Sequence, residues 1–584
     1  MRNEELQPRA GAGLIARSLR TEWPSLAIGL VCALVWSGAR LGIPLLTAYT
    51  IDSAIDNTDG ADVGLLAKLC LAIIALAGVQ AIAAGARRYF AMRTSYRIEA
   101  DIRSALYDSV NRLSFDYHDR IGTGQLMSRG SADLHEIQNF IVAIPINFAA
   151  LLMAAGAFIV MLQYNIGLAF SALCVYPAVS MITARFYTRL FPATSRLQQD
   201  LGNLASVVEE NVAGARLIRS FGREDHEIQK LGRVADDIYA NSMEVTRLRT
   251  IYTPLFSLLP SVGQLVIISY GGWLVIQGDV SIGHFVAFMQ YLNMLIWPVQ
   301  SLGEQIASGQ RAVTSAARVW NVLREEPTVS EAPHARPLPD GRGEVVFDHV
   351  DFSYLPGRPV LRDFSLRVPA GMAVALVGPT GCGKSTVARL LPRFYDIEGG
   401  AISIDGVDIR ELKLEELRRN VGLVFEDTFL FSDSVRNNIA YGRLDATDDE
   451  IESAAQLAQA FEFIDQTPAG YDTVVGEQGH SLSGGQRQRI AIARAVLMQP
   501  RVLILDDATS SVDARMEEDI RSALRRVMEG RTTIIISHRL STISLADQVV
   551  LLDHGRVAAM GRHEDLMSGN AAYGEVLGQL AMAT

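Results

Sequence analysis

Hydrophobic and polar residues follow two different patterns in the two parts of the chain. In the first part, six long apolar stretches lie at about 24–54, 63–90, 140–163, 166–186, 251–277 and 282–299. Each is long enough for a helix that crosses a bilayer, which takes about 20 apolar residues. Beyond residue 343, short apolar runs alternate with polar segments, as buried strands do when they alternate with helices. We therefore predict an α-helical membrane domain of six transmembrane helices, followed by an α/β domain.

The segments between the apolar stretches differ in charge, and this predicts their side of the membrane. Residues 55–62, 164–165 and 278–281 contain no lysine or arginine, whereas 91–139 and 187–250 are long and arginine-rich. Basic connections stay in the cytosol, so both termini and both long connections are expected on the cytosolic side of a bacterial plasma (inner) membrane. We also expect residues 11–19 to form a short helix on the cytosolic membrane surface.

The two long connections keep helical periodicity, so the spanning helices are expected to continue well below the membrane and reverse there. Turn-like sequences stand at 119–129 and 220–225. Plain solvated hairpins would look the same, but these turns are the parts of the membrane domain expected farthest from the bilayer. A soluble domain would touch the membrane domain at such turns.

A segment rich in proline and polar residues, 325–340, marks a domain boundary. With 584 residues the chain is too long for one ordinary core. We predict a membrane domain over 1–320, a linker over 321–342 and a second domain over 343–584.

Composition narrows the function. The mean hydropathy is positive although 20% of the residues are charged, as expected for a membrane half joined to a soluble half. The net charge of −11 argues against nucleic acid as a partner. Three cysteines, Cys32, Cys70 and Cys174, lie in apolar runs and are expected as small core residues.

A glycine-rich segment in the second domain predicts phosphate binding. The residues Gly378, Thr380, Gly381, Cys382, Gly383, Lys384, Ser385 and Thr386 follow an apolar strand-like run and precede a helix-like one. In this strand–loop–helix order, backbone N–H groups surround a β-phosphate, Lys384 reaches the β and γ oxygens, and Ser385 holds Mg²⁺. ATP and Mg²⁺ are therefore the expected cofactors. Because Cys382 lies at a helix N-terminus, we expect a favoured thiolate whose alkylation blocks nucleotide binding.

Later apolar runs end in acidic residues or histidine, as buried parallel strands do when their carboxyl ends carry chemistry. Asp506 is expected to hold Mg²⁺, Asp507 to orient or deprotonate the attacking water, and His538 to contact the γ-phosphate. Taken alone, His538 would more often be structural. Tyr354 ends another strand-like segment and is placed to stack on a base, although an edge-strand tyrosine would look the same.

One charged residue lies within the predicted spans. Arg40 falls near the middle of the first apolar stretch, where an ionisable side chain is costly unless it faces a polar cavity or a partner. It is either a counter-ion for an anionic substrate, or one member of an internal salt bridge or a snorkelling side chain. Polar residues of the last two spans are more often helix-packing contacts: Gln264, Tyr270, Gln290, Tyr291 and Asn293.

With the phosphate loop, the segment Leu482-Ser483-Gly484-Gly485-Gln486 and the acidic strand ends, nearly the whole chain resembles the exporter-type half-transporters of the ABC transporter family. The resemblance implies a P-loop nucleotide-binding domain with a helical subdomain, and two halves paired head-to-tail. Each ATP would lie between one phosphate loop and the partner's Ser483–Gln486 segment. It also implies that Tyr354 stacks on adenine, that residues 476–479 touch the membrane half, and that the turns near 120–129 and 220–225 are coupling helices.

Two residues depart from the family pattern. Asp507 replaces a catalytic glutamate, which leaves its carboxylate about an ångström short of the water, and Glu426 replaces a glutamine that senses Mg²⁺ and water. A carboxylate can still bind magnesium, so Glu426 is expected both near the reaction and as a metal ligand. Such departures resemble one half of a heterodimeric exporter, in which the site built on Asp507 turns over slowly.

The sequence thus predicts an ATP-hydrolysing transporter subunit that moves an amphipathic or lipid-like substrate, with membrane lipids and a second half-transporter as partners. Three alternatives stay open: uptake of a lipid or siderophore-like compound through the same fold, a homodimeric exporter, and a nucleotide-gated channel or regulator that carries no cargo.

Overall fold

The computed structural model describes residues 8–56, 62–174, 176–507 and 514–583, and it falls into two compact units. The first comprises residues 1–111 and 123–325, and the second comprises 112–122 and 326–584. The boundary between the two units at residues 325 and 326 lies in the proline-rich segment. The sequence-based limits at 320 and 342 stay predictions of the domain boundaries.

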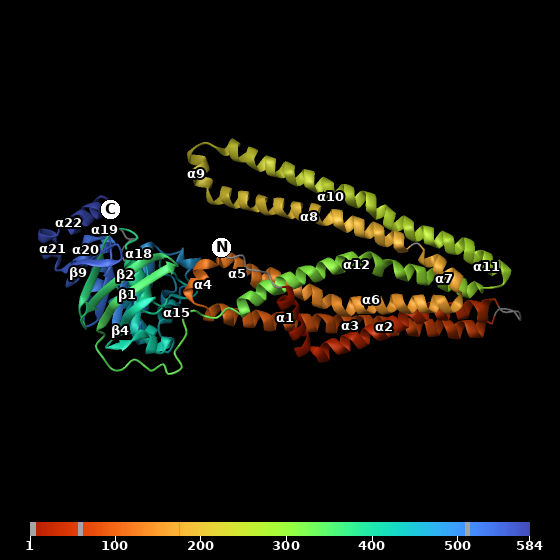
Figure 1. Cartoon of the computed structure of the whole chain (residues 1–584), viewed down its shortest axis with the longest axis horizontal. Coiled ribbons are helices and arrows are strands. Elements are labelled where there is room, and N and C mark those ends of the chain that lie inside the picture. The colour runs from red at the N-terminus through yellow and green to blue at the C-terminus, as the bar shows by residue number, and fades with distance from the viewer. Residues whose placement is uncertain (1–7, 57–61, 175, 508–513, 584) are drawn as a thin grey trace. The chain divides into compact units, whose positions relative to one another are not determined.

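The first unit is made of helices (Figure 1). They are α1 (Pro8–Thr21), α2 (Trp23–Thr50), α3 (Val63–Arg112), α5 (Thr123–Ser128), α6 (Leu134–Tyr164), α7 (Ile166–Leu173), α8 (Tyr176–Ala213), α9 (Ala215–Ser220), α10 (Glu224–Val266), α11 (Gly272–Gln277) and α12 (Ile282–Leu323). Short π-helices extend three of them: η1 (Ile51–Ile55), η2 (Arg129–Asp133) and η3 (Ile267–Gly271).

Six helical stretches in the described residues are long and apolar enough to cross a membrane, which confirms the predicted number. They run much farther than a bilayer requires: α3 has 50 residues, or about 75 Å at 1.5 Å per residue, against a hydrocarbon core of about 30 Å. The predicted continuation of the helices below the membrane is thus present. The predicted reversal at 220–225 falls between the end of α9 at Ser220 and the start of α10 at Glu224.

The carboxylate of Asp52 connects the C-terminal end of the first span to the start of the last span by hydrogen bonds. Asp52 in η1 accepts hydrogen bonds from the Ser281 hydroxyl at 2.6 Å and the Gly283 backbone N–H at 2.7 Å, at the start of α12. A Cβ at Gly283 would lie 2.2 Å from the Ala48 carbonyl oxygen, so only glycine allows this approach.

Helix α1 packs on protein. Its Leu14 and Ile15 are buried, and Gly11 lies so close to α12 that a Cβ would stand 2.3 Å from the Val313 carbonyl oxygen. The expected helix at 11–19 therefore exists, and its buried face packs on α12. Its place at the membrane surface stays a prediction.

The second unit holds two sheets and short helices. An antiparallel sheet has the order β2 (Arg358–Val368), β1 (Val345–Leu355), β4 (Gly399–Ile404) and β5 (Val407–Asp408). The main sheet has the order β10 (Arg556–Gly561), β9 (Gln548–Asp553), β3 (Ala373–Val377), β8 (Thr532–Ile536), β7 (Val502–Asp506) and β6 (Val421–Val424). All neighbours in the main sheet are parallel except the edge strand β10.

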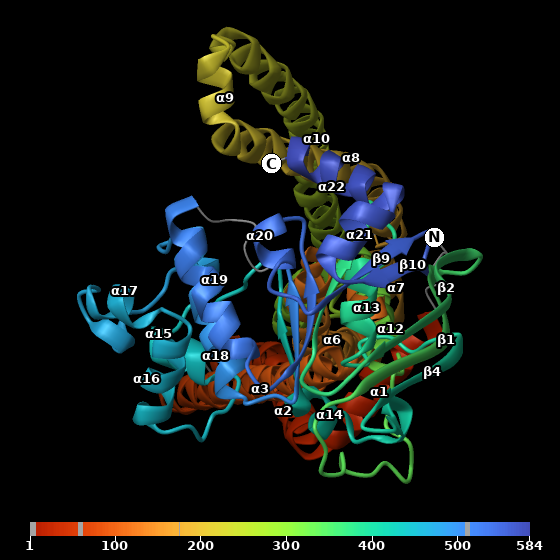
Figure 2. The same ribbon diagram turned by 90° about the vertical axis from the view of Figure 1, so that its left-hand side faces the viewer.

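The helices of this unit follow the strands in sequence. They are α4 (Phe115–Arg120), α13 (Lys384–Leu390), α14 (Leu414–Asn420), α15 (Val435–Ala440), α16 (Asp448–Leu457), α17 (Phe461–Asp465), α18 (Gly484–Leu497), α19 (Ala514–Met528), α20 (Leu540–Ile543), α21 (His563–Gly569) and α22 (Ala571–Ala583). Three 3₁₀ turns complete them: η4 (Ile409–Glu411), η5 (Gly470–Asp472) and η6 (Glu477–Gly479). Figure 2 shows the helices α15 to α18 gathered beside the main sheet. These helices form the helical subdomain.

Strands β3 and β8 are buried along their whole length, because helices cover both faces of a parallel sheet. Their carboxyl ends lie at one edge together with that of β7. The glycine-rich loop, the two aspartates and His538 leave the sheet at this edge, and the fold thereby gathers the predicted site residues.

Candidate nucleotide-binding site

The glycine-rich loop has the shape that phosphate binding requires. It leaves β3 after Val377 and turns into α13 at Lys384, with Gly381 and Gly383 in the left-handed region at φ +82° and +107°. At Gly378 a Cβ would lie 2.3 Å from the Leu552 carbonyl oxygen, so a side chain there would push the loop away from β9. The glycines therefore allow the tight turn of the loop between β3 and α13.

Lys384 is buried within this loop. Its ammonium donates hydrogen bonds to the Gly378 carbonyl at 2.8 Å and the Pro379 carbonyl at 2.9 Å. These bonds hold the positive charge beside the N-terminus of α13, where N–H groups and the lysine both favour a bound anion.

Two oxygen ligands for a divalent cation meet across the sheet edge. The Ser385 hydroxyl at the start of α13 lies 3.2 Å from Asp506 Oδ1 at the end of β7. Burial, reinforced by the charge of Asp507, raises the pKa of Asp506, and the Ser385 hydrogen bond opposes that rise. In the described residues no three His, Cys, Asp or Glu side chains gather as a metal site, so phosphate and water oxygens would have to supply the other ligands of Mg²⁺.

Residues at the end of strand β8 bond both the backbone and the carboxylate of Asp507. It is 8% exposed and adopts φ +47°, and its backbone N–H donates to the Ile536 carbonyl at 2.8 Å. Its Oδ1 accepts hydrogen bonds from the Ser537 hydroxyl at 3.3 Å and the His538 backbone N–H at 3.4 Å. His538 Nε2 lies 3.8 Å from Asp507 Oδ2, so the two predicted catalytic side chains are neighbours.

Glu426 lies in the loop after β6 with an exposed side chain. Burial of the carboxyl, and then the charges of Asp507, Asp427 and Asp506, raise its pKa. Glu426 therefore lies within electrostatic reach of Asp506 and Asp507.

Tyr354 is the penultimate residue of β1, and 39% of its surface is exposed, as a base-stacking ring requires. Its hydroxyl lies 3.3 Å from Thr386 Oγ1, which links the ring to the helix that follows the phosphate loop. The predicted base-stacking position and phosphate loop therefore belong to one local structure.

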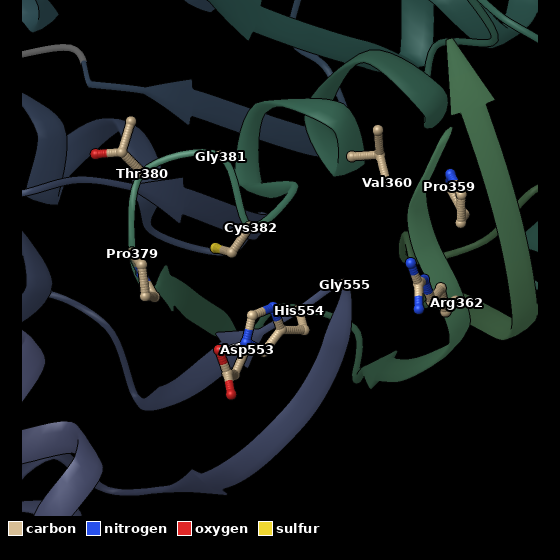
Figure 3. Close-up of a pocket in the computed structure, with 10 residues that line it drawn as sticks. All are labelled: Pro359, Val360, Arg362, Pro379, Thr380, Gly381, Cys382, Asp553, His554 and Gly555. Atoms are coloured by element: carbon tan, nitrogen blue, oxygen red, sulfur yellow. Dashed lines mark ion pairs between the residues drawn. The ribbon is translucent and has the colours of Figure 1, made fainter. Parts of the chain in front are cut away.

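Cys382 lines a hollow of about 390 Å³ beside the loop, together with Val360, Arg362 and the turn from Asp553 to Gly555 (Figure 3). Its thiol is 7% exposed and lies 3.9 Å from Lys384 Nζ. Burial raises the pKa of the Cys382 thiol, although Lys384 opposes that rise. The expectation that the helix N-terminus favours a thiolate is therefore wrong for this structure.

The Ser483–Gln486 segment lies at the start of α18. Ser483 and Gln486 form a capping box: Gln486 N donates to Ser483 Oγ at 3.3 Å, and Ser483 N donates to Gln486 Oε1 at 2.8 Å. Gly484 lines a hollow of about 350 Å³ that also includes Glu426 and Gln478 of η6. In the described part of the chain, no contact joins this segment to Lys384.

Sequence reasoning missed two features around the site. Ser537 bonds Asp507, and its only signal was its place beside His538 at a strand end. Tyr395 contacts the ring of Tyr354 at a centroid distance of 5.1 Å and belongs to an aromatic cluster with Phe115 and Phe394. The pair Phe394-Tyr395 was visible in the sequence but carried no recognised motif.

Comparison with known proteins agrees with this arrangement. Residues 26–299 match the family model of the ABC transporter transmembrane region, and residues 361–510 match that of the ABC transporter ATP-binding region, described as "ABC transporter". A multidrug efflux ATP-binding/permease protein of Mycobacterium tuberculosis is 38% identical over 94% of this chain, and the chain spans 46% of that protein's length. An ATP-dependent lipid A-core flippase of Syntrophus aciditrophicus is 36% identical over 95% of this chain and 92% of its own length.

Among solved structures, a bacterial Atm1-family ABC exporter with ATP bound matches with a TM-score of 0.79 and 29% identity, over 96% of this chain and 99% of that one. The chain thus aligns with the flippase and with the solved exporter over more than nine-tenths of their lengths, whereas it spans about half of the efflux protein. This chain is a multi-pass membrane protein that belongs to the ABC transporter family and has the exporter fold.

Proposed function

We propose that the chain is one half of an ATP-driven exporter that moves an amphipathic or lipid-like substrate across the bacterial inner membrane. One observation carries the proposal: a complete phosphate loop, with Lys384 in place and Ser385 facing Asp506, is covalently joined to six membrane spans. Ser385, Asp506 and Glu426 would hold Mg²⁺, which neutralises phosphate charge when it is bound. The functions of two relatives, multidrug efflux and lipid A-core flipping, support an amphipathic substrate and export.

The exposed apolar surface of the α8–α9–α10 hairpin supports assembly with a second half-transporter. Helices α8 and α10 run side by side and are joined by α9 (Figure 1). Large apolar residues on its far part are exposed: Val208, Val212, Leu217, Phe221 and Ile228. Val208 lies about 48 Å from the start of α8 and Ile228 about 57 Å from the end of α10, both more than the bilayer core of about 30 Å. Apolar side chains exposed to water in this number mark a protein interface.

We further propose that the second half is a different chain with a catalytic glutamate. Asp507 is one methylene shorter than glutamate, and its carboxylate is bonded to Ser537 and the His538 backbone. A general base must come within hydrogen-bond reach of its water, so this carboxylate is poorly placed for fast hydrolysis. The fast site would then combine this chain's Ser483–Gln486 segment with the partner's phosphate loop.

Arg40 supports an anionic head group on the substrate. Ala33, Ser37, Arg40 and Pro44 share one face of α2; the other three are buried, whereas Arg40 is exposed. No ion pair within the described residues involves Arg40. A charged side chain near the middle of a span must face a polar space. We therefore place Arg40 at the surface of the path along which a substrate would pass. Arg40→Gln should abolish stimulation of ATPase activity by an anionic amphiphile, and Arg40→Lys should retain it.

The decisive experiment measures ATPase activity in lipid nanodiscs, for the chain alone and for the chain co-expressed with the half-transporter encoded next to it. Activity of the pair alone, retained in Asp507→Asn and abolished by Ser483→Arg, would establish the division of labour. Brisk activity of the chain alone that disappears in Asp507→Ala would instead make it a homodimer with Asp507 as a sufficient base. Absence of substrate-stimulated activity and of accumulation in vesicles would contradict transport altogether.

A further inference from the structure

A short segment of the cytosolic connection, residues 112–122, belongs to the second unit although its sequence neighbours belong to the first. Within it, Leu113, Ser114 and Tyr117 are buried, and Phe115 stacks on Phe394 at a centroid distance of 4.3 Å. We call residues 112–122 the docked segment.

The linker also holds the docked segment. The Val329 backbone N–H donates to Ser114 Oγ at 3.0 Å, and the Thr328 hydroxyl donates to Asp116 Oδ1 at 2.9 Å. The predicted turn at 119–129 thus divides: residues up to Gly122 belong to the docked segment, whereas α5 and η2 stay with the first unit. Docking begins earlier in the chain than the turn signal indicated, because Phe115 supplies the apolar contact.

Tyr395 is the side chain that joins the docked segment to the base-stacking position. It is buried, and its hydroxyl donates a hydrogen bond to the Asp119 carboxylate. Its ring meets the ring of Tyr354 edge-on, with a centroid distance of 5.1 Å and an interplanar angle of 89°. Burial, and then the bond to Asp119, raise the pKa of Tyr395, so the hydroxyl stays protonated and remains a donor at neutral pH.

Arg389 reinforces the same connection. Its guanidinium interacts electrostatically with Tyr354. Burial lowers the pKa of Arg389, but Tyr354, Tyr395 and Asp119 together outweigh that effect and raise it. The cation therefore stays charged among the three residues that link the base-stacking ring to the docked segment.

We propose that Tyr395 is a positioning residue that couples nucleotide binding at Tyr354 to the docking of residues 112–122. The inference rests on the proposed function, because it takes Tyr354 as the ring on which the base stacks. A base that stacks on Tyr354 fixes this ring, the fixed ring orders Tyr395, and the ordered hydroxyl holds Asp119. Coupling between two binding equilibria is reciprocal: if bound nucleotide strengthens docking by some factor, docking strengthens nucleotide binding by the same factor. A variant that breaks the contact with Asp119 should therefore lose both effects.

The test compares Tyr395→Phe, Asp119→Asn and the double variant, each as the full chain in nanodiscs. Tyr395→Phe keeps the ring contact and removes only the donor, and Asp119→Asn keeps the side-chain volume. Two quantities are measured: the Kd of mant-ATP with Mg²⁺, and the hydrogen-exchange protection that ATP adds to residues 112–122. Tyr573→Phe is the matched control, because Tyr573 is a buried tyrosine of the same domain whose hydroxyl lies 2.6 Å from His563 Nδ1.

We expect ATP to protect residues 112–122 in the wild type, and each single variant to lose most of that added protection while Kd rises about three- to tenfold. The double variant should match the single variants, since all three break one contact. Tyr573→Phe should leave both quantities unchanged. If the wild type binds mant-ATP but the protection is absent, or survives in Tyr395→Phe, the inference is wrong while the proposed function stands. If the wild type fails to bind mant-ATP, the proposed function is wrong and the inference falls with it.

Discussion

At the residue scale, Asp507 shows how a strand end limits the reach of a carboxylate that we propose to be catalytic. Strand β8 holds its backbone through the Ile536 carbonyl and its carboxylate through Ser537 and the His538 N–H. A short side chain that is bonded in this way cannot follow a water molecule without breaking those bonds. A glutamate at this position would extend its carboxylate farther from the same backbone position.

Asp507→Glu should therefore accelerate hydrolysis at this chain's own site. A displacement of about 1 Å can change a rate by about a hundredfold, which sets the upper limit of the gain. The measurement is single-turnover ATP hydrolysis by the nanodisc complex, with Asp507→Asn as the isosteric control that lacks a base. An unchanged rate in Asp507→Glu would show that the position of this carboxylate does not limit the reaction.

Glu426 gives a prediction in pH. Its pKa is raised above 4.5, chiefly by burial, so the native state holds the proton more tightly than the unfolded state. The contribution of that proton to the free energy of unfolding is complete below the ordinary pKa of glutamate. It is lost as the pH rises through the raised pKa of the native state. Glu426→Gln removes the carboxylate, so its melting temperature should exceed that of the wild type at pH 7 and approach it near pH 4. A variant that is less stable than the wild type at pH 7 would contradict this assignment.

The sequence identified the charged groups of the site better than their environment. The positions of Lys384, Ser385 and Asp506 followed from motif spacing, because a strand, a loop and a helix impose one geometry on them. The pKa of Cys382 and the bonds of Asp507 could not be predicted. They depend on how β8 and β9 pack beside β3, and that packing is set by residues more than 100 positions away.

At the scale of elements, α1 packs on α12 and approaches its backbone closely at Gly11. A Cβ at Gly11 would lie 2.3 Å from the Val313 carbonyl oxygen and 2.7 Å from Ala317 N, whereas a Cβ at Gly13 would meet nothing within 4 Å. Both glycines belong to the same helix, so they form a matched pair for a packing test.

Gly11→Ala should lower the melting temperature, since a methyl group forced into a closed contact costs about 1–3 kcal/mol. Gly13→Ala should be neutral or stabilising by up to about 1 kcal/mol, because alanine favours the helix. Thermal unfolding in detergent checks both, and limited trypsin digestion at Arg17 and Arg20 reports release of α1 directly. Equal melting temperatures for the two variants would mean that α1 does not dock on α12 in solution.

The spans were predictable as elements because membrane helices need long uninterrupted apolar stretches. Their ends were not, since α3 continues through Arg-rich sequence to Arg112, where polarity no longer distinguishes helix from connection. The contact of the helix at 11–19 with α12 was not predictable for a related reason. An amphipathic pattern shows that a face must be covered but does not tell whether lipid or another helix covers it.

At the scale of the whole molecule, the chain carries more apolar surface than one half can bury. Phe221 is 71% exposed and Leu217 63% exposed, at the turn between α8 and α10. A monomer gains nothing from these side chains, so their removal should spare the fold of the chain and weaken its assembly with a second half.

Leu217→Ser and Phe221→Ser should therefore insert and melt like the wild type, while the assembled pair dissociates more readily and its ATPase activity falls by about tenfold, the effect of about 1.4 kcal/mol at an interface. Ser220→Ala is the matched control, because it changes an exposed residue of the same turn without removing an apolar side chain. Native mass spectrometry measures the assembly, and ATP hydrolysis at equal protein concentration measures its consequence. If assembly and activity survive both serine substitutions, the hairpin turn does not contact the second half, and the surface that joins the halves must lie elsewhere on the spans.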